Sequence, residues 1–326
     1  MTKAVLTMVK GSMQYWPHRR ARKRLPRLRN HSPSAEQLSN IIAFKAGMTH
    51  VMITDDSNSP SKNMEIMRPC TVLEIPKMEV YGIRAYGKDG ITGYTTAKQE
   101  VLHKGTAQKI NIKNVKTDES KLDSLKNNAK EFSKISALIV AYPKELNVEQ
   151  NHPLRFESPI GGKTIQEQLD NAAKLLGKTI RISESFKNGE FVDVSSISIG
   201  KGWQGVIKRR NLSMHRRKAT GKRRHSATLG SFGDHKVRWT VPQAGQMGFN
   251  YRTEHNKRIL KMGAKEDVES INMSGGFKNY GPVRSDFVVI DGSVPGPAMR
   301  LVRIRKSIRE RNAAGIKEPK ISYIAK

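Results

Sequence analysis

Apolar residues in the first part of the chain are grouped into runs that short polar clusters separate. Three of these runs are rich in β-branched and aromatic residues, which favour strands, and turn-forming residues bound them. One boundary is the cluster 55–60, where Asp55 and Asp56 are expected to form a turn. The pattern predicts β-strands at residues 41–54, 70–75 and 79–87.

The middle of the chain has mixed charges and helix-forming residues, in a segment from about 101 to 189. Thr164 and Glu167 have the spacing of a capping box, and Gly177 suits the end of a helix. Apolar residues follow the box at helical spacing: Ile165, Leu169, Ala172 and Leu176. Residues 136–143 (SALIVAYP) predict a buried strand. A small inserted α/β subdomain is therefore expected here.

Strand-like patterns return in the last third of the chain. Residues 191–200 predict one strand, and residues 286–308 predict a hairpin that turns around 295–297. In the second arm of this hairpin Val302 and Ile304 alternate with Arg303 and Arg305, which predicts one buried and one cationic face. Since strands from both ends of the chain flank the insert, we expect one β-barrel assembled from discontinuous segments.

The composition of the chain indicates the kind of partner that it binds. The chain has 59 Lys and Arg against 29 Asp and Glu, a formal net charge of +30 and a pI of about 10.3. Such an excess repels itself in a compact protein unless a polyanion neutralises it. The chain has no apolar run of about 18 residues, and its N-terminus lacks the apolar core of a signal peptide. Composition therefore favours nucleic acid over a membrane as the partner.

Basic residues are concentrated in two segments. The first precedes His31 and contains no acidic residue. Because it cannot form a packed core alone, we predict an extended arm that becomes ordered on RNA. Its candidate RNA-binding residues are Arg19, Arg20, Arg22, Lys23, Arg24, Arg27 and Arg29.

The second basic segment runs from residue 201 to 261, and its only acidic residues are Asp234 and Glu254. Glycine recurs there, and the apolar residues follow no single period, which predicts a long loop that penetrates folded RNA rather than a solvated surface loop. Arginine can hold phosphate with two hydrogen bonds, and planar rings can stack on unpaired bases. The candidate RNA-binding residues are Lys201, Trp203, Lys208, Arg209, Arg210, His215, Arg216, Arg217, Lys218, Lys222, Arg223, Arg224, His225, Phe232, Lys236, Arg238, Trp239, Gln246, Arg252, Lys257 and Arg258. Trp239 alternates with Val237 and Val241, so packing along a short strand is an equal alternative for it.

Several motifs in order resemble one family. They are GSMQYWPHRRARKR (11–24), FKAGMTH (44–50), PCTVLEIPKMEVYGIRAYG (69–87), GKGWQGVIKR (200–209), AGQMGFNYRTEHNKRILKMG (244–263), GGFKNYG (275–281) and DGSVPGPAMRLV (291–302). Each is similar to a stretch of ribosomal protein L3. The chain resembles eukaryotic members more than bacterial ones but lacks their long basic C-terminal tail, which indicates the archaeal type.

The resemblance implies a fold and a function. The fold is mainly β with an α/β insert, built on a six-stranded, translation-protein-like β-barrel with a long basic N-terminal arm and central loop. The function is that of a structural, non-enzymatic protein of the large ribosomal subunit in the cytoplasm. Members bind 23S rRNA early in assembly, reach towards the peptidyl-transferase centre and contact neighbouring ribosomal proteins, for which we expect one of the L14 type.

Two positions depart from the eukaryotic members. Phe232 stands where they carry a tryptophan at the tip of the loop, so its contacts are expected to differ in detail. Thr220 stands where they carry a modified histidine, so that modification is not expected here.

The pattern and the resemblance together predict six segments. They are a basic extension (1–37), a first part of the barrel (38–100), the α/β insert (101–177), further barrel strands (178–200), the basic central extension (201–262) and the last part of the barrel with the C-terminal tail (263–326).

Other functional sites find less support. Residues 200–205 match G-x-G-x-x-G, but no amphipathic helix follows and the next acid is Asp234, so a dinucleotide site is not expected. Cys70 is the only cysteine, which excludes intramolecular disulfides and cysteine-based zinc sites. The histidines lack metal-ligand spacing, and no nucleophile–base pair or cofactor pocket supports an RNA-modifying enzyme. A DNA-compacting protein would use helices or a β-ribbon. We expect no cofactor, no metal and no small-molecule substrate.

Overall fold

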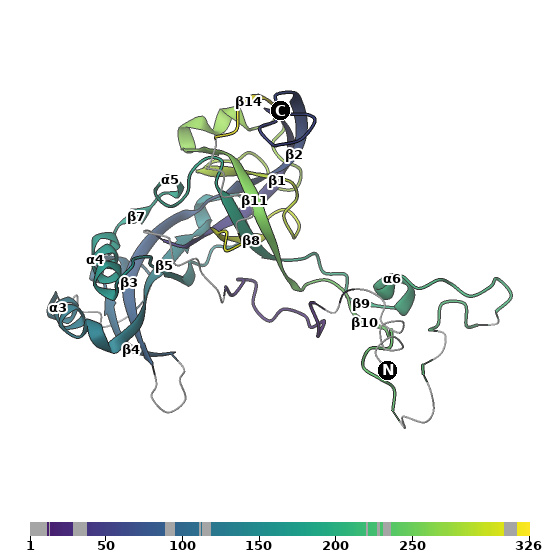
Figure 1. The fold of residues 1–326 in the computed structure, drawn as a ribbon, viewed down its shortest axis with the longest axis horizontal. Coiled ribbons are helices and arrows are strands. Elements are labelled where there is room, and N and C mark those ends of the chain that lie inside the picture. The colour runs from purple at the N-terminus through teal and green to yellow at the C-terminus, as the bar shows by residue number, and fades with distance from the viewer. Residues whose placement is uncertain are drawn as a thin grey trace. The chain divides into compact units, whose positions relative to one another are not determined.

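The computed structural model describes residues 12, 14–28, 38–88, 95–110, 112, 119–219, 221–226, 229–230, 236–309 and 318–326. The chain divides into two units, each made of segments far apart in the sequence. Unit 1 comprises Met1–Arg24 and Ile197–Arg252, and unit 2 comprises Leu25–Ser196 and Thr253–Lys326. The prediction of a mainly β protein is confirmed, because large antiparallel sheets dominate unit 2 (Figure 1).

The larger sheet joins strands from both ends of the chain. Its strand order is β13 (Leu301–Lys306), β8 (Phe191–Ile197), β11 (Tyr251–Gly263), β12 (Phe287–Asp291), β2 (Glu65–Glu74), β1 (Asn40–Thr54) and β14 (Ile321–Ile324). The first part of β1 also pairs with β13, with Asn40 opposite Arg305 and Phe44 opposite Leu301. The pairing of β13, β8, β11, β12, β2 and β1 therefore returns to the strand at which it began.

The smaller sheet contains the insert. It has the order β4 (Thr95–Leu102), β3 (Lys77–Lys88), β5 (Phe132–Tyr142) and β6 (Leu154–Pro159), and β7 (Thr179–Ile180) pairs with β3. The predicted buried strand at 136–143 is confirmed as part of β5. Strands β3 and β4 belong to this smaller sheet, although the sequence places most of their residues in the first part of the barrel (38–100). Only two residues, Ile75 and Pro76, separate β2 from β3, and the chain changes sheet there.

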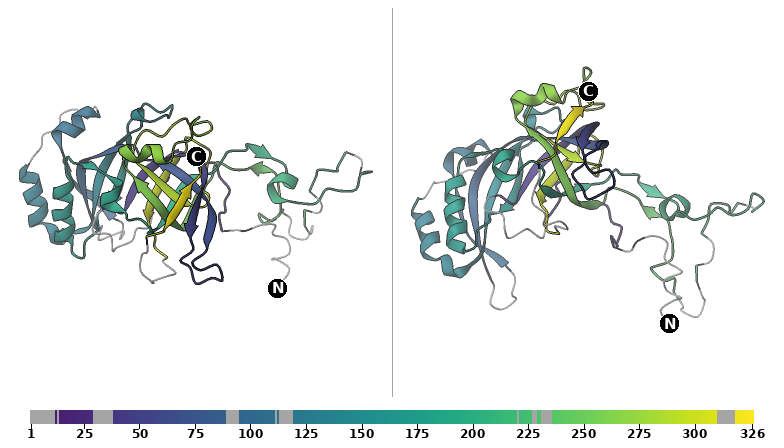
Figure 2. Two further views of the ribbon diagram at one scale, coloured as in Figure 1. Left: turned by 90° about the horizontal axis from the view of Figure 1, so that it is seen from above. Right: turned by 45° about the horizontal axis from the view of Figure 1, so that its top comes forward.

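Short helices accompany the smaller sheet. They are α2 (Lys104–Lys109), α3 (Glu119–Asn127), α4 (Ile165–Leu175) and α5 (Ile182–Ser185), with 3-10 turns at Ala129–Glu131, Pro143–Glu145 and, near the larger sheet, Lys265–Ser270. Helix α4 packs on β5, and α3 packs on α4 (Figure 2). The capping prediction is confirmed, since Thr164 accepts a hydrogen bond from the Glu167 amide at 3.3 Å. Leu169 and Ala172 are the buried residues of α4.

One hydrophobic core extends across both sheets of unit 2. Its largest fully buried side chains include Phe44, Phe186 and Phe287. Cys70 is buried within this core, and burial raises the pKa of its thiol to about 12, so it is an inert packing residue. Residues 197–252 contribute none of the described members of this core.

The prediction of a hairpin at 286–308 is wrong. Strand β12 pairs with β2 and β11, whereas β13 pairs with β1 and β8. The nine residues between them do not pair the two strands as a hairpin, and Gly292, Gly296 and Met299 there have positive φ. A chain segment of this length lets the two strands join different neighbours.

The predicted cationic face of β13 is also wrong, because both of its arginines are buried. Arg303 is 6% exposed and donates to Asn40 Oδ1 and to the carbonyl oxygens of Pro26 and Glu157. Arg305 is 7% exposed and its Nη2 lies 2.9 Å from Asp193 Oδ2. Polar partners from distant segments therefore satisfy the two guanidinium groups inside the fold.

Candidate nucleic-acid interface

The two ends of the central basic segment pair with each other in unit 1. Strand β9 (Trp203–Gln204) is antiparallel to β10 (Gly245–Gln246). Amide-to-carbonyl bonds continue the pairing, from Lys201 to Met247 at 2.9 Å and from Phe249 to Ile199 at 3.3 Å. Gly248 has a φ of +71°, and a Cβ there would lie 2.0 Å from the Ile199 oxygen. The close approach of the two chain segments therefore requires glycine at this position.

Helix α6 (Val206–Arg210) follows β9 and carries three consecutive cations, Lys208, Arg209 and Arg210. Asn211 ends the helix in the left-handed conformation, with a φ of 53°. The Arg209 side chain reaches back across the base of the segment, where Nη1 donates to the Gln243 oxygen at 2.8 Å and Nε to the Gln246 oxygen at 3.1 Å. These two bonds fix its guanidinium plane.

The N-terminal arm contacts the C-terminal end of the central basic segment, at Phe249 and Asn250. The Ala21 amide donates to the Phe249 oxygen at 2.8 Å, and Asn250 Nδ2 donates to the Arg19 oxygen at 2.8 Å. The Arg20 guanidinium lies 4.9 Å from the centre of the Phe249 ring. The two basic segments that the sequence separates by more than 170 residues are thus brought together in one unit.

Trp16 forms the centre of an aromatic and cationic cluster. The Arg210 guanidinium lies 4.3 Å from its ring centroid, Trp239 meets it edge-on at 5.0 Å and His18 lies at 5.3 Å. Trp239 is 69% exposed and outside any described strand, so the structure does not support packing along a strand for it. Tyr15, which lies beneath the Arg252 guanidinium at 4.2 Å, and Trp16 were missed by the sequence analysis, because basic residues dominate the composition of the arm.

Most predicted RNA-binding side chains of unit 1 are exposed. Trp203 is 76% exposed. The other exposed candidates are Arg19, Arg20, Arg22, Lys23, Arg24, Lys201, Lys208, His215, Arg216, Arg217, Lys218, Lys222, Arg223, Arg224, His225, Lys236, Arg238 and Trp239. Arg209, Arg210, Gln246 and Arg252 are partly buried. Apart from Asp234, which lies outside the described residues, the sequence of this unit contains no acid.

Some candidates lie elsewhere. Arg27, Lys257 and Arg258 belong to unit 2, and Arg29 and Phe232 lie outside the described residues. Arg258 makes a two-pronged ion pair with Asp56, with nitrogen–oxygen distances of 2.7 and 2.5 Å, and Lys257 lies 3.9 Å from Glu254. These two side chains have partners within the protein.

Unit 1 also contains a cavity of about 370 Å³ between the arm and the central segment. The residues that line it include His18 from the arm and Arg209, Arg210 and Arg252 from the central segment. Burial, and then the charges of these three arginines, lower the pKa of His18 below its ordinary value. The cavity is therefore strongly positive even when the histidine is neutral.

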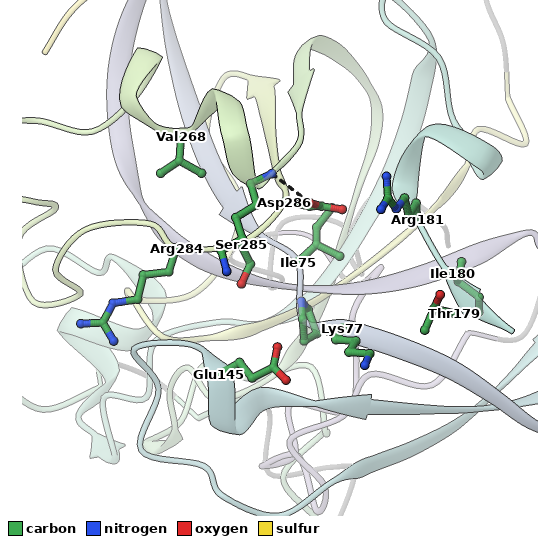
Figure 3. A pocket seen from close by; sticks show the side chains of 12 residues that line it. Ile75, Lys77, Glu145, Thr179, Ile180, Arg181, Val268, Arg284, Ser285 and Asp286 are labelled. Carbon is green, nitrogen blue, oxygen red and sulfur yellow. Dashed lines mark hydrogen bonds between the residues drawn. The ribbon is translucent and has the colours of Figure 1, made fainter. Parts of the chain in front are cut away.

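Unit 2 has a larger cavity, of about 740 Å³, where the chain passes from β2 to β3. Figure 3 shows that the acidic residues Glu145 and Asp286 line it together with basic residues. The dashed line marks the 3.1 Å hydrogen bond from the Lys265 amide to the Asp286 carboxylate. Positively charged, negatively charged and apolar residues therefore all line this cavity. No cluster of three or more His, Cys, Asp or Glu that could hold a metal occurs in the described part of the chain.

Among the described residues, no helix is both long and apolar enough to span a membrane.

Comparison with known proteins assigns the family. A profile of the family described as "Ribosomal protein L3" matches residues 2–325. The chain is 39% identical to "Large ribosomal subunit protein uL3" of Methanothermobacter thermautotrophicus, covering 97% of this chain and 96% of that one. The corresponding protein of Methanobrevibacter smithii is 38% identical over 97% and 96%, and that of Methanopyrus kandleri is 39% identical over 97% and 90%. The chain therefore belongs to the ribosomal protein L3 family, of the archaeal type, and is a structural constituent of the large ribosomal subunit in the cytoplasm rather than an enzyme.

Proposed function

We propose that unit 1 is the part of the protein that binds 23S rRNA, with the N-terminal arm and the central extension acting as one surface. The observation that carries the proposal is the docking of the arm on residues 249–251. Docking places two positively charged segments against each other, although like charges repel. A polyanion bound by both segments removes that repulsion and releases counterions.

The side chains of unit 1 suit folded RNA rather than a regular duplex. Arginines offer planar forks for phosphates, and exposed Trp203 and Trp239 offer ring faces for unpaired bases. The phosphate contacts would position the protein, and stacking would select places where the RNA is not paired. The glycines of the central extension allow the backbone to approach RNA closely.

We further propose that the closed order of β1, β2, β12, β11, β8 and β13 is a six-stranded barrel. In this proposal the protein binds early in assembly of the subunit, and the central extension supports the architecture near the peptidyl-transferase centre. Ribosomal proteins, including one of the L14 type, would contact the rest of its surface. The six segments proposed from the sequence are kept with two changes: β3 and β4 are counted with the smaller sheet, and residues 251–263 are counted with the strands of the larger sheet.

Salt dependence of binding tests the proposal. Affinity for a 23S rRNA fragment should fall with salt with a log–log slope steeper than about −5, since each phosphate contact contributes roughly 0.7 to 0.9. Replacing Arg216, Arg217 and Lys218 together by Ala should flatten the slope by about 1 to 3 units. The control replaces three exposed lysines of unit 2, Lys130, Lys174 and Lys178, by Ala.

Both variants lose the same charge, so only location distinguishes them. Equal slopes for the two variants would contradict RNA binding through unit 1. Sedimentation of the tagged protein in a sucrose gradient gives the second readout. The wild-type chain should travel with large subunits, and absence from that fraction would contradict the proposed function as a whole.

A further inference from the structure

The cavity of unit 1 lies where the arm meets the central extension. Ser12 and His18 of the arm line one side, and residues 198 to 252 supply the remainder. Its volume of about 370 Å³ is within the range of small-ligand sites, so one nucleotide unit could enter it. No carboxylate lines it in the described part of the chain.

Contacts within the protein hold the arginines of the cavity in place. Arg209 is fixed by two carbonyl oxygens, and Gly245 leaves room for it, because a Cβ there would lie 3.0 Å from Arg209 Cζ. Arg252 stacks on Tyr15 and donates to the Tyr251 oxygen at 2.8 Å. Less side-chain entropy is then lost when a ligand binds.

The pKa of His18 depends on the charge of the cavity. It is partly buried and close to Arg209, Arg210 and Arg252, and burial and these charges lower its pKa. An anion in the cavity would favour the protonated form and so raise the pKa again. The protonated ring would then offer two N–H donors.

We propose that this cavity is a preformed binding site for one backbone phosphate of unpaired RNA. Arg209, Arg210 and Arg252 bind the phosphate, and His18 closes the site from the arm. The proposal rests on the proposed function of unit 1 and adds to it a defined ligand and a defined place. Because the two basic segments share the site, the bound phosphate also attaches the arm to the central extension.

The experiment follows His18 by NMR in the full-length protein during a pH titration. His18→Gln assigns its signals. The probe is hexauridylate, a flexible single strand, and the matched ligand is the same hexamer with uncharged methylphosphonate linkages. Hexauridylate should raise the pKa of His18, and the uncharged hexamer should leave it unchanged.

Charge variants locate the effect. Arg252→Gln should abolish the change at His18 and weaken hexauridylate binding roughly tenfold or more, as expected for a lost charge-assisted hydrogen bond. The matched control, Arg216→Gln, removes an equal charge from an exposed position of the same unit and should retain the change at His18. Arg252→Lys keeps the charge but loses the planar fork. This variant should bind hexauridylate less tightly than wild type does. Hexauridylate should still raise the pKa of His18 in it.

The outcomes separate this proposal from the proposed function. If hexauridylate binds but leaves the pKa of His18 unchanged, the cavity is not the phosphate site, and RNA binding by unit 1 stands. The same holds if hexauridylate changes the pKa of His18 equally in Arg252→Gln and Arg216→Gln. If neither hexauridylate nor the 23S fragment binds at low salt, both proposals fall.

Discussion

At the scale of single residues, Arg303 is held by neutral oxygens. Nε and Nη2 donate to Asn40 Oδ1 at 3.0 and 2.8 Å, and Nη1 donates to the Pro26 oxygen at 3.1 Å. Burial lowers the pKa of Arg303 to about 10, so it is still charged at neutral pH. Arg303→Met should lower the free energy of unfolding by about 1 to 3 kcal/mol, since it leaves these buried acceptors without donors.

Urea denaturation at pH 7 checks this, with exposed Arg309→Met as the control. An unchanged midpoint for Arg303→Met would show that apolar packing compensates fully for the lost bonds. The sequence did not reveal this role of Arg303. The alternation of Val302 to Arg305 predicts a strand, but Pro26, Asn40 and Glu157 are remote in sequence, so nothing nearby indicated that the arginine is satisfied internally.

A second residue carries a dependence on pH. The carboxylate of Asp55 accepts from the Ser57 amide at 2.9 Å and from the hydroxyls of Ser59 and Ser61 at 2.8 and 2.6 Å. These bonds hold its pKa well below the usual range. A depressed pKa in the folded state stabilises the protein above the unfolded pKa, which is about 3.9, and this contribution is lost as pH falls towards the folded value.

Asp55→Asn should therefore be less stable than wild type at pH 7, and the difference should shrink as pH falls below about 4. Urea unfolding at pH 7, 5 and 3 measures it. Ser61→Ala keeps the carboxylate but removes one donor, and should give an intermediate result. A difference that is constant with pH would mean that the carboxylate's charge does not stabilise the turn.

At the scale of elements, the positions of the strands in the sequence were more predictable than the pairing between them. The segments that became β1, β2, β5 and β8 were identified from runs of apolar and β-branched residues, which depend on local sequence. Pairing depends on contacts remote in sequence, so the hairpin of β12 and β13 was predicted wrongly. β11 was counted with the basic loop because Arg252, Lys257 and Arg258 mask its strand pattern.

Two glycines of unit 1 allow a matched test at this scale. Gly248 and Gly202 both have positive φ, at +71° and +65°. A Cβ would strike the Ile199 oxygen at Gly248 but would meet nothing within 4 Å at Gly202. Gly202→Ala should thus cost only the left-handed backbone strain, about 1 to 2 kcal/mol, whereas Gly248→Ala should also separate the paired ends of the central extension.

Affinity for the 23S fragment and thermal unfolding of unit 2 are the measurements. Gly248→Ala should weaken binding more than Gly202→Ala, with the melting of unit 2 unchanged in both. Equal affinities of the two variants would show that the pairing of residues 199–203 with 245–249 does not support RNA binding.

At the scale of the whole molecule, the two units differ in what holds them together. Unit 2 has the hydrophobic core, whereas the described buried apolar residues of unit 1 are few, among them Ala21, Val206 and Val241. Unit 1 relies on hydrogen bonds and on arginines stacked on aromatic rings, such as Arg210 on Trp16 and Arg252 on Tyr15. Such contacts contribute little where water reaches them.

Hydrogen exchange should expose this difference. In the free protein, amides of β1, β2 and β5 should exchange slowly, through global unfolding, because the core of unit 2 must open first. Amides that pair residues 199–203 with 245–249 should exchange much faster, since little apolar surface is buried there to offset the entropy of ordering. Addition of the 23S fragment should slow exchange in unit 1 and leave β5 unchanged. Strong protection of unit 1 without RNA would contradict this account, because it would require that hydrogen bonds and cation–π contacts alone overcome the repulsion between the two basic segments.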